Sequence, residues 1–199
     1  FRAHVREFAR AEIAPWVKEW DEVEQLPTHG ILPKMGAAGL IGITGPKRLG
    51  GGEKDYISLG IAIEELGRVD TSCAMICSVN NTMSTLIPGW GDDVVRSVFR
   101  GEKLLSIATS EDNSGSDVAN LETTAAIEGD RFVINGKMIH VSLMPGADYM
   151  GVTAWVDWKD GKKPRITFIK VPSDTPGVSC EPMADRRPGE YLQLRHRRR

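Results

Sequence analysis

The 199-residue sequence has few cysteines, few aromatic residues and no long apolar run. Its cysteines, Cys73, Cys77 and Cys180, form no CxxC pair and no Cys/His ligand spacing, so we expect neither a disulfide framework nor a zinc site. Every apolar stretch falls well short of the roughly 20 residues that a membrane-crossing helix needs. No basic segment followed by an apolar one opens the chain as a secretory signal would. These absences predict a soluble, unsecreted protein with no membrane span, in a reducing compartment.

Charge of one sign is not in large excess either. The 25 Lys and Arg against 27 Asp and Glu give a net charge of −2, which argues against a nucleic-acid-binding protein because no basic field covers a domain. The basic residues are unevenly spread, since residues 186–199 hold six arginines and one glutamate. We therefore expect the end of the chain to differ in kind from its body.

The first hundred residues carry helical patterns. Apolar residues spaced by three and four predict an amphipathic helix over residues 1–20, which Pro15 kinks or ends early. A short helix through about Ala38 is expected to end at Gly39 in the left-handed conformation, before a glycine-rich loop at Gly42–Glu53. Further helices are predicted at Tyr56–Gly67 with Asp55 as N-cap, from Asp70–Ser72 through about Thr85, and at Gly91–Arg100.

After Gly101 the pattern changes to short apolar runs between turn signals. Strands are predicted at Leu104–Thr109, Thr123–Ile127, Arg131–Ile134, Tyr149–Trp155, Ile166–Val171 and Gly177–Glu181. Hairpin turns are expected at Glu128–Asp130 and Asp160–Pro164. Helices followed by strands indicate an α+β fold: an all-helical N-terminal domain at 1–102, a small antiparallel β-barrel or sandwich domain at 103–185, and an Arg-rich tail at 186–199.

One turn at the domain junction carries candidate chemistry. Ser110–Asp117 (SEDNSGSD) follows the first strand, and such a small-residue turn can present backbone N–H groups and hydroxyls to an anion or to a flat, acceptor-rich ring. Gly115 lets a ligand approach the backbone closely. The alternative is that Ser, Asn, Asp and Gly serve here only as turn formers.

Several segments read together resemble one family. Met35–Ile43 (MGAAGLIGI), Pro46–Gly51 (PKRLGG) and Glu64–Asp70 (EELGRVD) come first, and Ala108–Glu111, Gly115–Asp117, Asn135–Gly136, Ala147–Asp148 and Thr175–Val178 follow in the same order. This series resembles the N-terminal and middle domains of the acyl-CoA dehydrogenases over residues 1 to about 185. The resemblance implies FAD in a cleft between the β domain and a further C-terminal helical domain.

The resemblance also implies site residues. Ile107, Thr109 and Ser110 would contact the flavin, whereas Gly115 and Ser116 would hold its phosphate-bearing arm or the pantetheine of the substrate. Ser116 would touch both FAD and acyl-CoA. A second flavin-binding strand would be His140-Val141-Ser142, in which Ser142 keeps a hydroxyl and His140 replaces the usual aromatic residue. The alternative for His140 is a half-buried strand histidine that makes one hydrogen bond.

In the family, a glutamate of the C-terminal domain removes the α-proton of an acyl-CoA thioester and FAD takes the β-hydride, which gives a 2,3-enoyl-CoA. Electrons then leave through an electron-transfer flavoprotein. We expect the C-terminal domain to lie outside these 199 residues, so that the catalytic base is not in this chain. The chain alone is then expected to bind FAD weakly or not at all, and to be inactive. Homo-oligomerisation is expected only with that domain, and the location is cytoplasmic, or the mitochondrial matrix if the source is eukaryotic.

The Arg-rich tail no longer follows the family after Asp185. A shifted reading frame would give such an ending, and a genuine basic tail for an acidic partner or membrane surface is the alternative. Two other functions stay open: a flavin monooxygenase or acyl-CoA oxidase on the same fold, whose reduced flavin meets O₂, and a non-catalytic acyl-CoA- or flavin-binding scaffold.

For three further groups of residues, a purely structural role is an alternative to a functional one. Adjacent helix residues diverge by about 100°, so Glu64 and Glu65 favour a solvated, salt-bridged face over a paired-carboxylate site. Cys73 and Cys77 are expected to be buried packing thiols. The polar run Asn80–Thr82 would either line a pocket for a polar acyl group or lie exposed at a fraying helix end.

Overall fold

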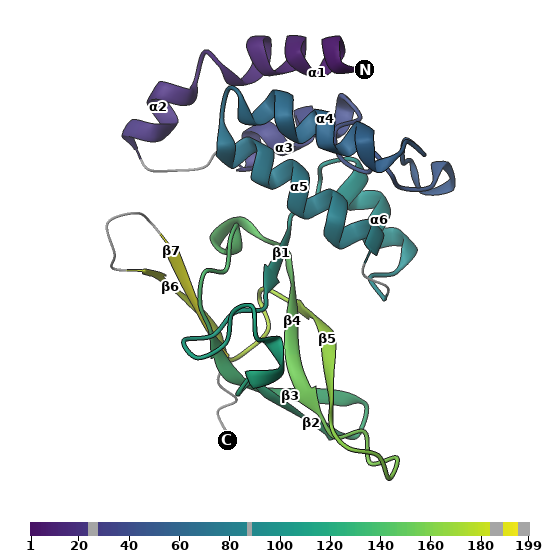
Figure 1. Cartoon of the computed structure of the whole chain (residues 1–199), viewed down its shortest axis with the longest axis vertical. Coiled ribbons are helices and arrows are strands. Elements are labelled where there is room, and N and C mark those ends of the chain that lie inside the picture. The colour runs from purple at the N-terminus through teal and green to yellow at the C-terminus, as the bar shows by residue number, and fades with distance from the viewer. Residues whose placement is uncertain (24–27, 87–88, 184–188, 195–199) are drawn as a thin grey trace. The chain divides into compact units, whose positions relative to one another are not determined.

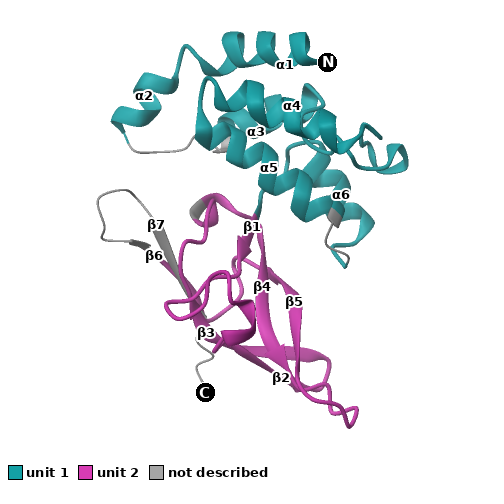
Figure 2. Cartoon of the chain, viewed as in Figure 1, with its two compact units in different colours: residues 1–105 teal, residues 106–199 magenta. Residues whose placement is uncertain are grey.

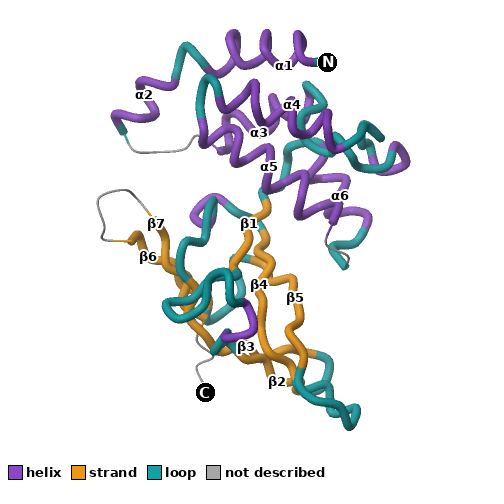
Figure 3. Tube along the Cα trace, in the orientation of Figure 1, coloured by secondary structure: helices purple, strands orange, loops and turns teal. Residues whose placement is uncertain are grey.

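The computed structural model describes residues 1–23, 28–86, 89–183 and 189–194. The chain divides into two compact units, residues 1–105 and residues 106–199 (Figure 2). The first unit is helical and the second is built of strands (Figure 3). This is the α+β architecture that the sequence predicts. No helix among the described residues is long and apolar enough to cross a membrane.

In its described residues, the helical unit contains six α-helices, which Figure 1 labels. They are α1 (Arg2–Phe8), α2 (Val17–Glu22), α3 (Thr28–Ala37), α4 (Tyr56–Gly67), α5 (Thr71–Leu86) and α6 (Asp92–Phe99). A π-helical turn (Ala9–Ile13) follows α1, and a 3₁₀ turn (Lys47–Leu49) lies in the loop before α4. All the predicted helices of this unit are present, with boundaries shifted by a few residues.

Pro15 breaks the N-terminal helix, as predicted, and the break begins earlier than the proline itself. Proline has no N–H to donate and its ring crowds the carbonyl four residues back. The preceding turn widens, so that the Ala14 N–H donates to the Ala9 carbonyl at 2.9 Å. Val5, Ala9 and Ile13 form the buried stripe, whereas Trp16, which lies just beyond the break, remains 48% exposed.

Aspartate side chains cap the next two helices. The Asp55 carboxylate accepts from the Ser58 N–H at 2.8 Å at the start of α4, and Asp70 accepts from the Cys73 N–H at 2.6 Å at the start of α5. Each carboxylate satisfies a backbone donor that lacks a partner within its helix. These local hydrogen bonds explain why the helix starts could be read from the sequence.

The second unit is a curled seven-stranded sheet. Its strands are β1 (Leu105–Ala108), β2 (Thr124–Glu128), β3 (Arg131–Met138), β4 (Tyr149–Val156), β5 (Arg165–Pro172), β6 (Val178–Met183) and β7 (Gly189–Leu194). The order is β1-β4-β2-β3-β7-β6, and β5 also pairs with β4. β2 and β3 form a hairpin with Glu128 opposite Arg131, and β4 and β5 pair with Val156 opposite Arg165, so both predicted turns are confirmed.

The core of this unit gathers around β4. Met150, Val152, Ala154 and Val156 are all fully buried, against residues of β1, β2 and β5 such as Ala108, Ala125 and Ile169. β4 is a nearly continuous apolar run because both of its faces are buried. The pairs β2–β3, β3–β7, β4–β5 and β6–β7 are antiparallel. β2 and β4 pair in parallel at Thr124–Trp155 and Ala125–Val156.

Three features of the β unit differ from the sequence predictions. β3 extends four residues beyond the predicted end at Ile134, because polar residues on its exposed face weaken the alternating pattern. β7 forms where no strand is predicted, pairing with β3 and β6. The segment His140–Ser142, expected on a strand, lies outside one. Long-range pairing, which no local pattern records, decides the case of β7.

Candidate functional site

The turn Ser110–Asp117 is a compact, closed loop. The Glu111 N–H donates to the Ser114 carbonyl at 2.7 Å, and the Ser114 N–H donates back to the Glu111 carbonyl at 3.2 Å. The Ser114 hydroxyl donates to the Asp117 carbonyl at 2.6 Å. Glu111 and Ser114 are buried, so the base of the turn is fixed from within.

The outer part of the turn faces solvent with unused donors. Gly115 and Ser116 are exposed, and the space in front of Gly115 is open where a Cβ would stand. Across the described ranges, no hydrogen-bond acceptor is recorded for the N–H groups of Gly115, Ser116 and Asp117. Consecutive unused N–H groups beside hydroxyls suit an anionic group such as a phosphate. The outer part of the turn therefore has the donors that an anion-binding turn needs, and it remains a candidate site.

β1 leads into this turn, and its side chains alternate between a buried and a partly accessible side. Ser106 and Ala108 are buried, whereas Ile107 and Thr109 are half-buried on the opposite side, as the two-residue period of a strand requires. Ser110 is also half-buried. The side chains of Ile107 and Thr109 thus share one partly accessible face that runs toward the turn.

The second predicted segment lies directly beside Ser110. The Ile139 N–H donates to the Ser110 carbonyl at 2.8 Å, and the Ser106 hydroxyl donates to the Ser142 carbonyl at 2.6 Å. The structure therefore brings residues 107–110 and 139–142 together on one side of the β unit. Ser116 lies farther along the turn, linked to Ser110 through the Glu111–Ser114 pairing.

The backbone at His140 corrects the sequence prediction for this segment. His140 has φ +53° and Leu143 φ +68°, a left-handed conformation that non-glycine residues seldom adopt. β3 cannot continue through such a residue, so the chain turns after Ile139. His140 and Ser142 are exposed and Val141 is buried, which also excludes the alternative of a half-buried strand histidine.

Sequence reasoning missed Glu111 as an organising residue. Its side-chain oxygens accept from the N–H groups of Glu122 at 2.6 Å and Thr123 at 2.8 Å. A carboxylate inside a run of turn-forming residues resembles any solvated charge in sequence. Only its 6% exposure and these long-range partners distinguish it.

The adjacent glutamates of α4 form no paired-carboxylate site. Glu65 is 1% exposed and accepts from Arg2 at 2.6 Å and from Arg6 at 2.8 Å, and these two guanidinium groups, Arg6 first, lower the pKa of Glu65 to about 2. Glu64 stays half-exposed between Arg2 and Arg68. The expected salt-bridged face is present, but Glu65 is buried beneath α1 rather than solvated.

The polar residues of α5 neither line a pocket nor fray. Asn80 and Asn81 are fully buried. Asn80 accepts from the Leu105 N–H at 3.0 Å, and Asn81 accepts from the Ile43 N–H at 2.7 Å while donating to the Leu40 carbonyl at 2.9 Å. Both amides replace missing backbone partners, so neither suggested role for Asn80 and Asn81 is correct.

Cys73 and Cys77 are buried free thiols of α5, as expected. Burial raises the pKa of both thiols, that of Cys77 to about 12. Such groups remain protonated near neutral pH and do not act as nucleophiles.

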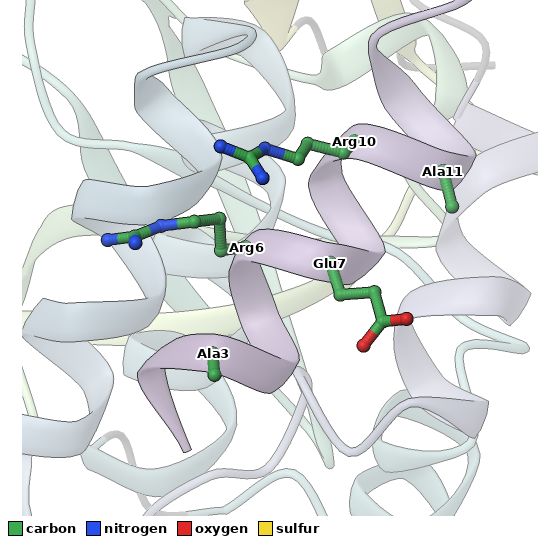
Figure 4. Close-up of a pocket in the computed structure, with 5 residues that line it drawn as sticks. All are labelled: Ala3, Arg6, Glu7, Arg10 and Ala11. Carbon is green, nitrogen blue, oxygen red and sulfur yellow. The ribbon is translucent and has the colours of Figure 1, made fainter.

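A hollow on the helical unit lies on the outer side of α1 and the π-helical turn. Figure 4 shows its lining: Ala3, Arg6, Glu7, Arg10 and Ala11. Arg6 is already held by Glu65 through two hydrogen bonds. No group of three metal-binding side chains occurs among the residues that the structure describes. The candidate site therefore remains the β-unit face.

Comparison with known proteins identifies the same regions. The family model for the N-terminal domain of acyl-CoA dehydrogenases matches residues 1–99, and that for the middle domain matches residues 106–191. A short-chain-specific acyl-CoA dehydrogenase of Clostridium acetobutylicum is 34% identical over 174 residues, which cover 84% of this chain and 46% of the relative. The chain spans about half the length of the curated relatives it matches.

Solved structures agree with this result. A glutaryl-CoA dehydrogenase from Mycobacterium smegmatis in complex with FADH2 superposes with a TM-score of 0.85 at 25% identity, covering 98% of this chain and 51% of the other. A structure described as an electron transferring flavoprotein of Acidaminococcus fermentans also has a TM-score of 0.85 at 25% identity, covering 98% and 53%. The chain belongs to the acyl-CoA dehydrogenase family and matches its N-terminal domain followed by its middle domain.

Proposed function

We propose that this chain forms the N-terminal and middle domains of an FAD-dependent acyl-CoA dehydrogenase that converts an acyl-CoA thioester to a 2,3-enoyl-CoA. The observation that carries the proposal is the run of unused N–H groups at Gly115–Asp117 beside the accessible face of β1. FAD, when bound, supplies the oxidant that accepts hydride from the substrate. Proposed domain limits are 1–102 and 103–185. β7, which lies within residues 186–199, pairs with β3 and β6 and is added to the middle domain, so that the separate tail begins after it.

Each residue of the face has a proposed task. Ile107, Thr109 and Val141 border the ring system, and the hydroxyls of Ser110 and Ser142 donate hydrogen bonds to it. A donor fixed in place before reaction stabilises negative charge that develops on a ring during hydride transfer. Gly115 and Ser116 hold the phosphate-bearing arm, with Ser116 also contacting the substrate.

At His140 this face differs from the family, which usually has an aromatic residue at the corresponding position. Its imidazole is exposed beside the Ile139–Ser110 bridge, where it can cover the ring by stacking. A histidine there places ring nitrogens that can hydrogen-bond where the family usually has an aromatic ring without them. We propose that the redox properties of the bound flavin therefore differ from those of family members with the usual aromatic residue.

The remaining parts of the reaction are proposed to lie outside these 199 residues. Since the relatives are about twice as long, we assign the proton-abstracting glutamate, the other wall of the cleft and the main oligomer contacts to a C-terminal helical domain. An electron-transfer flavoprotein is the proposed electron acceptor. The buried free thiols of α5 suit a reducing location, in the cytoplasm or in the mitochondrial matrix of a eukaryote.

A chimera tests the proposal. Residues 1–183 are joined to the C-terminal half of the C. acetobutylicum relative, purified with FAD, and mixed anaerobically with a short-chain acyl-CoA. Bleaching of the flavin absorbance and formation of the enoyl-CoA support the proposal. Acyl-CoA binding without bleaching of the flavin indicates a non-catalytic scaffold. If the reduced flavin is rapidly reoxidised when air is admitted, without an electron-transfer flavoprotein, the protein is an oxidase or monooxygenase.

The unmodified 199-residue chain is the control for that experiment. With one wall of the cleft, it is expected to retain no stoichiometric FAD through purification and to form no enoyl-CoA. Stoichiometric FAD in the purified chain would contradict the assignment of essential cofactor contacts to another domain.

A further inference from the structure

Glu111 is a buried carboxylate to which the proposed reaction gives no task. It is 6% exposed, and both side-chain oxygens receive backbone N–H donors, from Glu122 at 2.6 Å and from Thr123 at 2.8 Å. Burying a carboxylate carries a desolvation penalty that such donors offset. A neutral residue at this position of the turn would avoid the desolvation penalty, so the presence of a buried carboxylate needs an explanation.

The same residue closes the turn through its backbone. The paired hydrogen bonds between Glu111 and Ser114 fix the first half of Ser110–Asp117, while the side chain ties that half to the entrance of β2. Thr123 then continues the connection, because its carbonyl accepts from the Trp155 N–H of β4 at 2.9 Å. One residue thus couples the exposed turn to the most buried strand of the unit.

A second set of contacts ties the same two segments together on the outside. The Asn113 side chain donates to the Glu122 carboxylate at 2.8 Å, and the Asn120 side chain donates to the Asn113 carbonyl at 3.2 Å. These residues are exposed, where water competes for every hydrogen bond. The buried Glu111 contacts are shielded from that competition and are the stronger constraint.

We propose that Glu111 is the positioning residue of the turn: its carboxylate holds Gly115–Asp117 with their N–H groups presented to a phosphate-bearing ligand. This inference rests on the proposed function of the turn. Donors that are held in place before binding avoid the ordering cost that a loose loop would incur. Glu111 itself touches no ligand, since its oxygens face Glu122 and Thr123.

Amide exchange measured by NMR on the full chain tests the positioning itself. Glu111→Gln keeps the volume and one acceptor, Glu111→Ala removes both acceptors, and Glu128→Gln makes the same charge change on an exposed residue of β2. Because Glu111→Ala removes a buried acceptor, we expect amide exchange at Glu122, Thr123 and Ser114 to become about tenfold faster or more in this variant. The acceleration in Glu111→Gln should be smaller. Exchange in β4 and β5, for example at Val152 and Ile169, should be unchanged.

Two exchange results would overturn the inference. Unchanged exchange at Glu122 and Thr123 in both Glu111 variants would mean that the carboxylate holds nothing. Equal acceleration across β4 and β5 would mean that Glu111 supports the unit as a whole rather than the turn. Glu128→Gln is expected to match the wild type throughout.

FAD titration followed at the amides of Gly115–Asp117 separates this inference from the proposed function. Shifts in the wild type that are lost in Glu111→Ala and partly kept in Glu111→Gln support both. Equal shifts in wild type and Glu111→Ala overturn the inference and leave the proposed function standing. Without shifts in the wild type, the proposed role of the turn fails, and the exchange data alone decide whether Glu111 holds it.

Discussion

The side-chain oxygen of Asn81 accepts a hydrogen bond from the backbone N–H of Ile43 at 2.7 Å, and both residues are buried. The same amide donates to the Leu40 carbonyl. A residue of α5 thereby supplies, inside the core, the partners that a β-ladder would otherwise give to the segment between α3 and the glycine-rich loop. The loop keeps its irregular path without leaving buried backbone groups unpaired.

Replacing Asn81 is therefore expected to destabilise the helical unit. Asn81→Ala leaves the buried Ile43 N–H without its partner, which costs about 1–3 kcal/mol, and leaves the Leu40 carbonyl with the weakly donating Cys77 thiol at 3.3 Å. Urea titration followed by helical circular dichroism should show a loss of roughly 1–4 kcal/mol. Thr82→Ala, on the half-buried neighbour, is the matched control. A loss for Asn81→Ala no greater than for Thr82→Ala would contradict this role.

Glu65 predicts an acid-dependent loss of stability in the same unit. Hydrogen bonds from Arg6 and Arg2 lower the pKa of Glu65 to about 2 from an ordinary value of 4.5. Its contribution is complete above about 4.5 and declines as the pH falls toward 2, because the unfolded chain takes up the proton first. The urea midpoint of the helical signal should fall over this range in the wild type.

Variants separate Glu65 from the other carboxylates. Glu65→Gln should lower the midpoint at neutral pH and flatten its pH dependence, since a neutral amide is a poor partner for two guanidinium groups. Glu64→Gln should do less of both, because Glu64 is 47% exposed and exposed ion pairs contribute little. The same pH slope in wild type and Glu65→Gln would refute the assignment.

Close packing between β3 and the residue before β2 predicts that Gly136 cannot be replaced by a residue with a side chain without loss of stability. A Cβ on Gly136 would overlap the Thr123 hydroxyl and lie 2.6 Å from the Thr123 Cβ. Gly136 is half-buried and Thr123 is fully buried. Gly136→Ala should cost about 1–3 kcal/mol by overpacking. Gly115→Ala has open space around it and should leave the stability of the β unit unchanged. Similar stability losses in the two variants would contradict this packing argument.

The tail after Asp185 leads to a prediction about the gene. If its arginine-rich composition comes from a shifted reading frame, another frame of the coding DNA should continue into a helical domain containing a glutamate. Sequencing from codon 180 onward checks this. If no frame continues in that way, the basic tail is a genuine part of the product.

The sequence predicts those parts of the fold that depend on local chemistry. Asp55 and Asp70 cap helices through residues three positions away, and Gly39 ends α3 with φ +67°. Both hairpin turns of the β unit follow from their turn residues. Such features depend on a few adjacent residues and therefore leave a pattern that can be read.

What the sequence does not predict depends on partners far along the chain. Glu65 is buried because α1, about 60 positions earlier, brings Arg2 and Arg6 over it. β7 exists because β3 and β6 provide edges for it, and His140 leaves the strand although nothing in its neighbours signals a left-handed residue. The burial of Glu111 is hidden in the same way, because its partners Glu122 and Thr123 lie 11 and 12 positions along the chain.

We propose that β1, the turn after it and residues 140–142 form one side of a flavin site. FAD titrated to millimolar concentration into the labelled 199-residue chain tests this proposal most directly by NMR. We expect weak, saturable chemical-shift changes at the amides of these residues: Ile107, Thr109, Ser110, Gly115, Ser116, His140, Val141 and Ser142. Shifts confined to other residues, or no shifts at all, would contradict it.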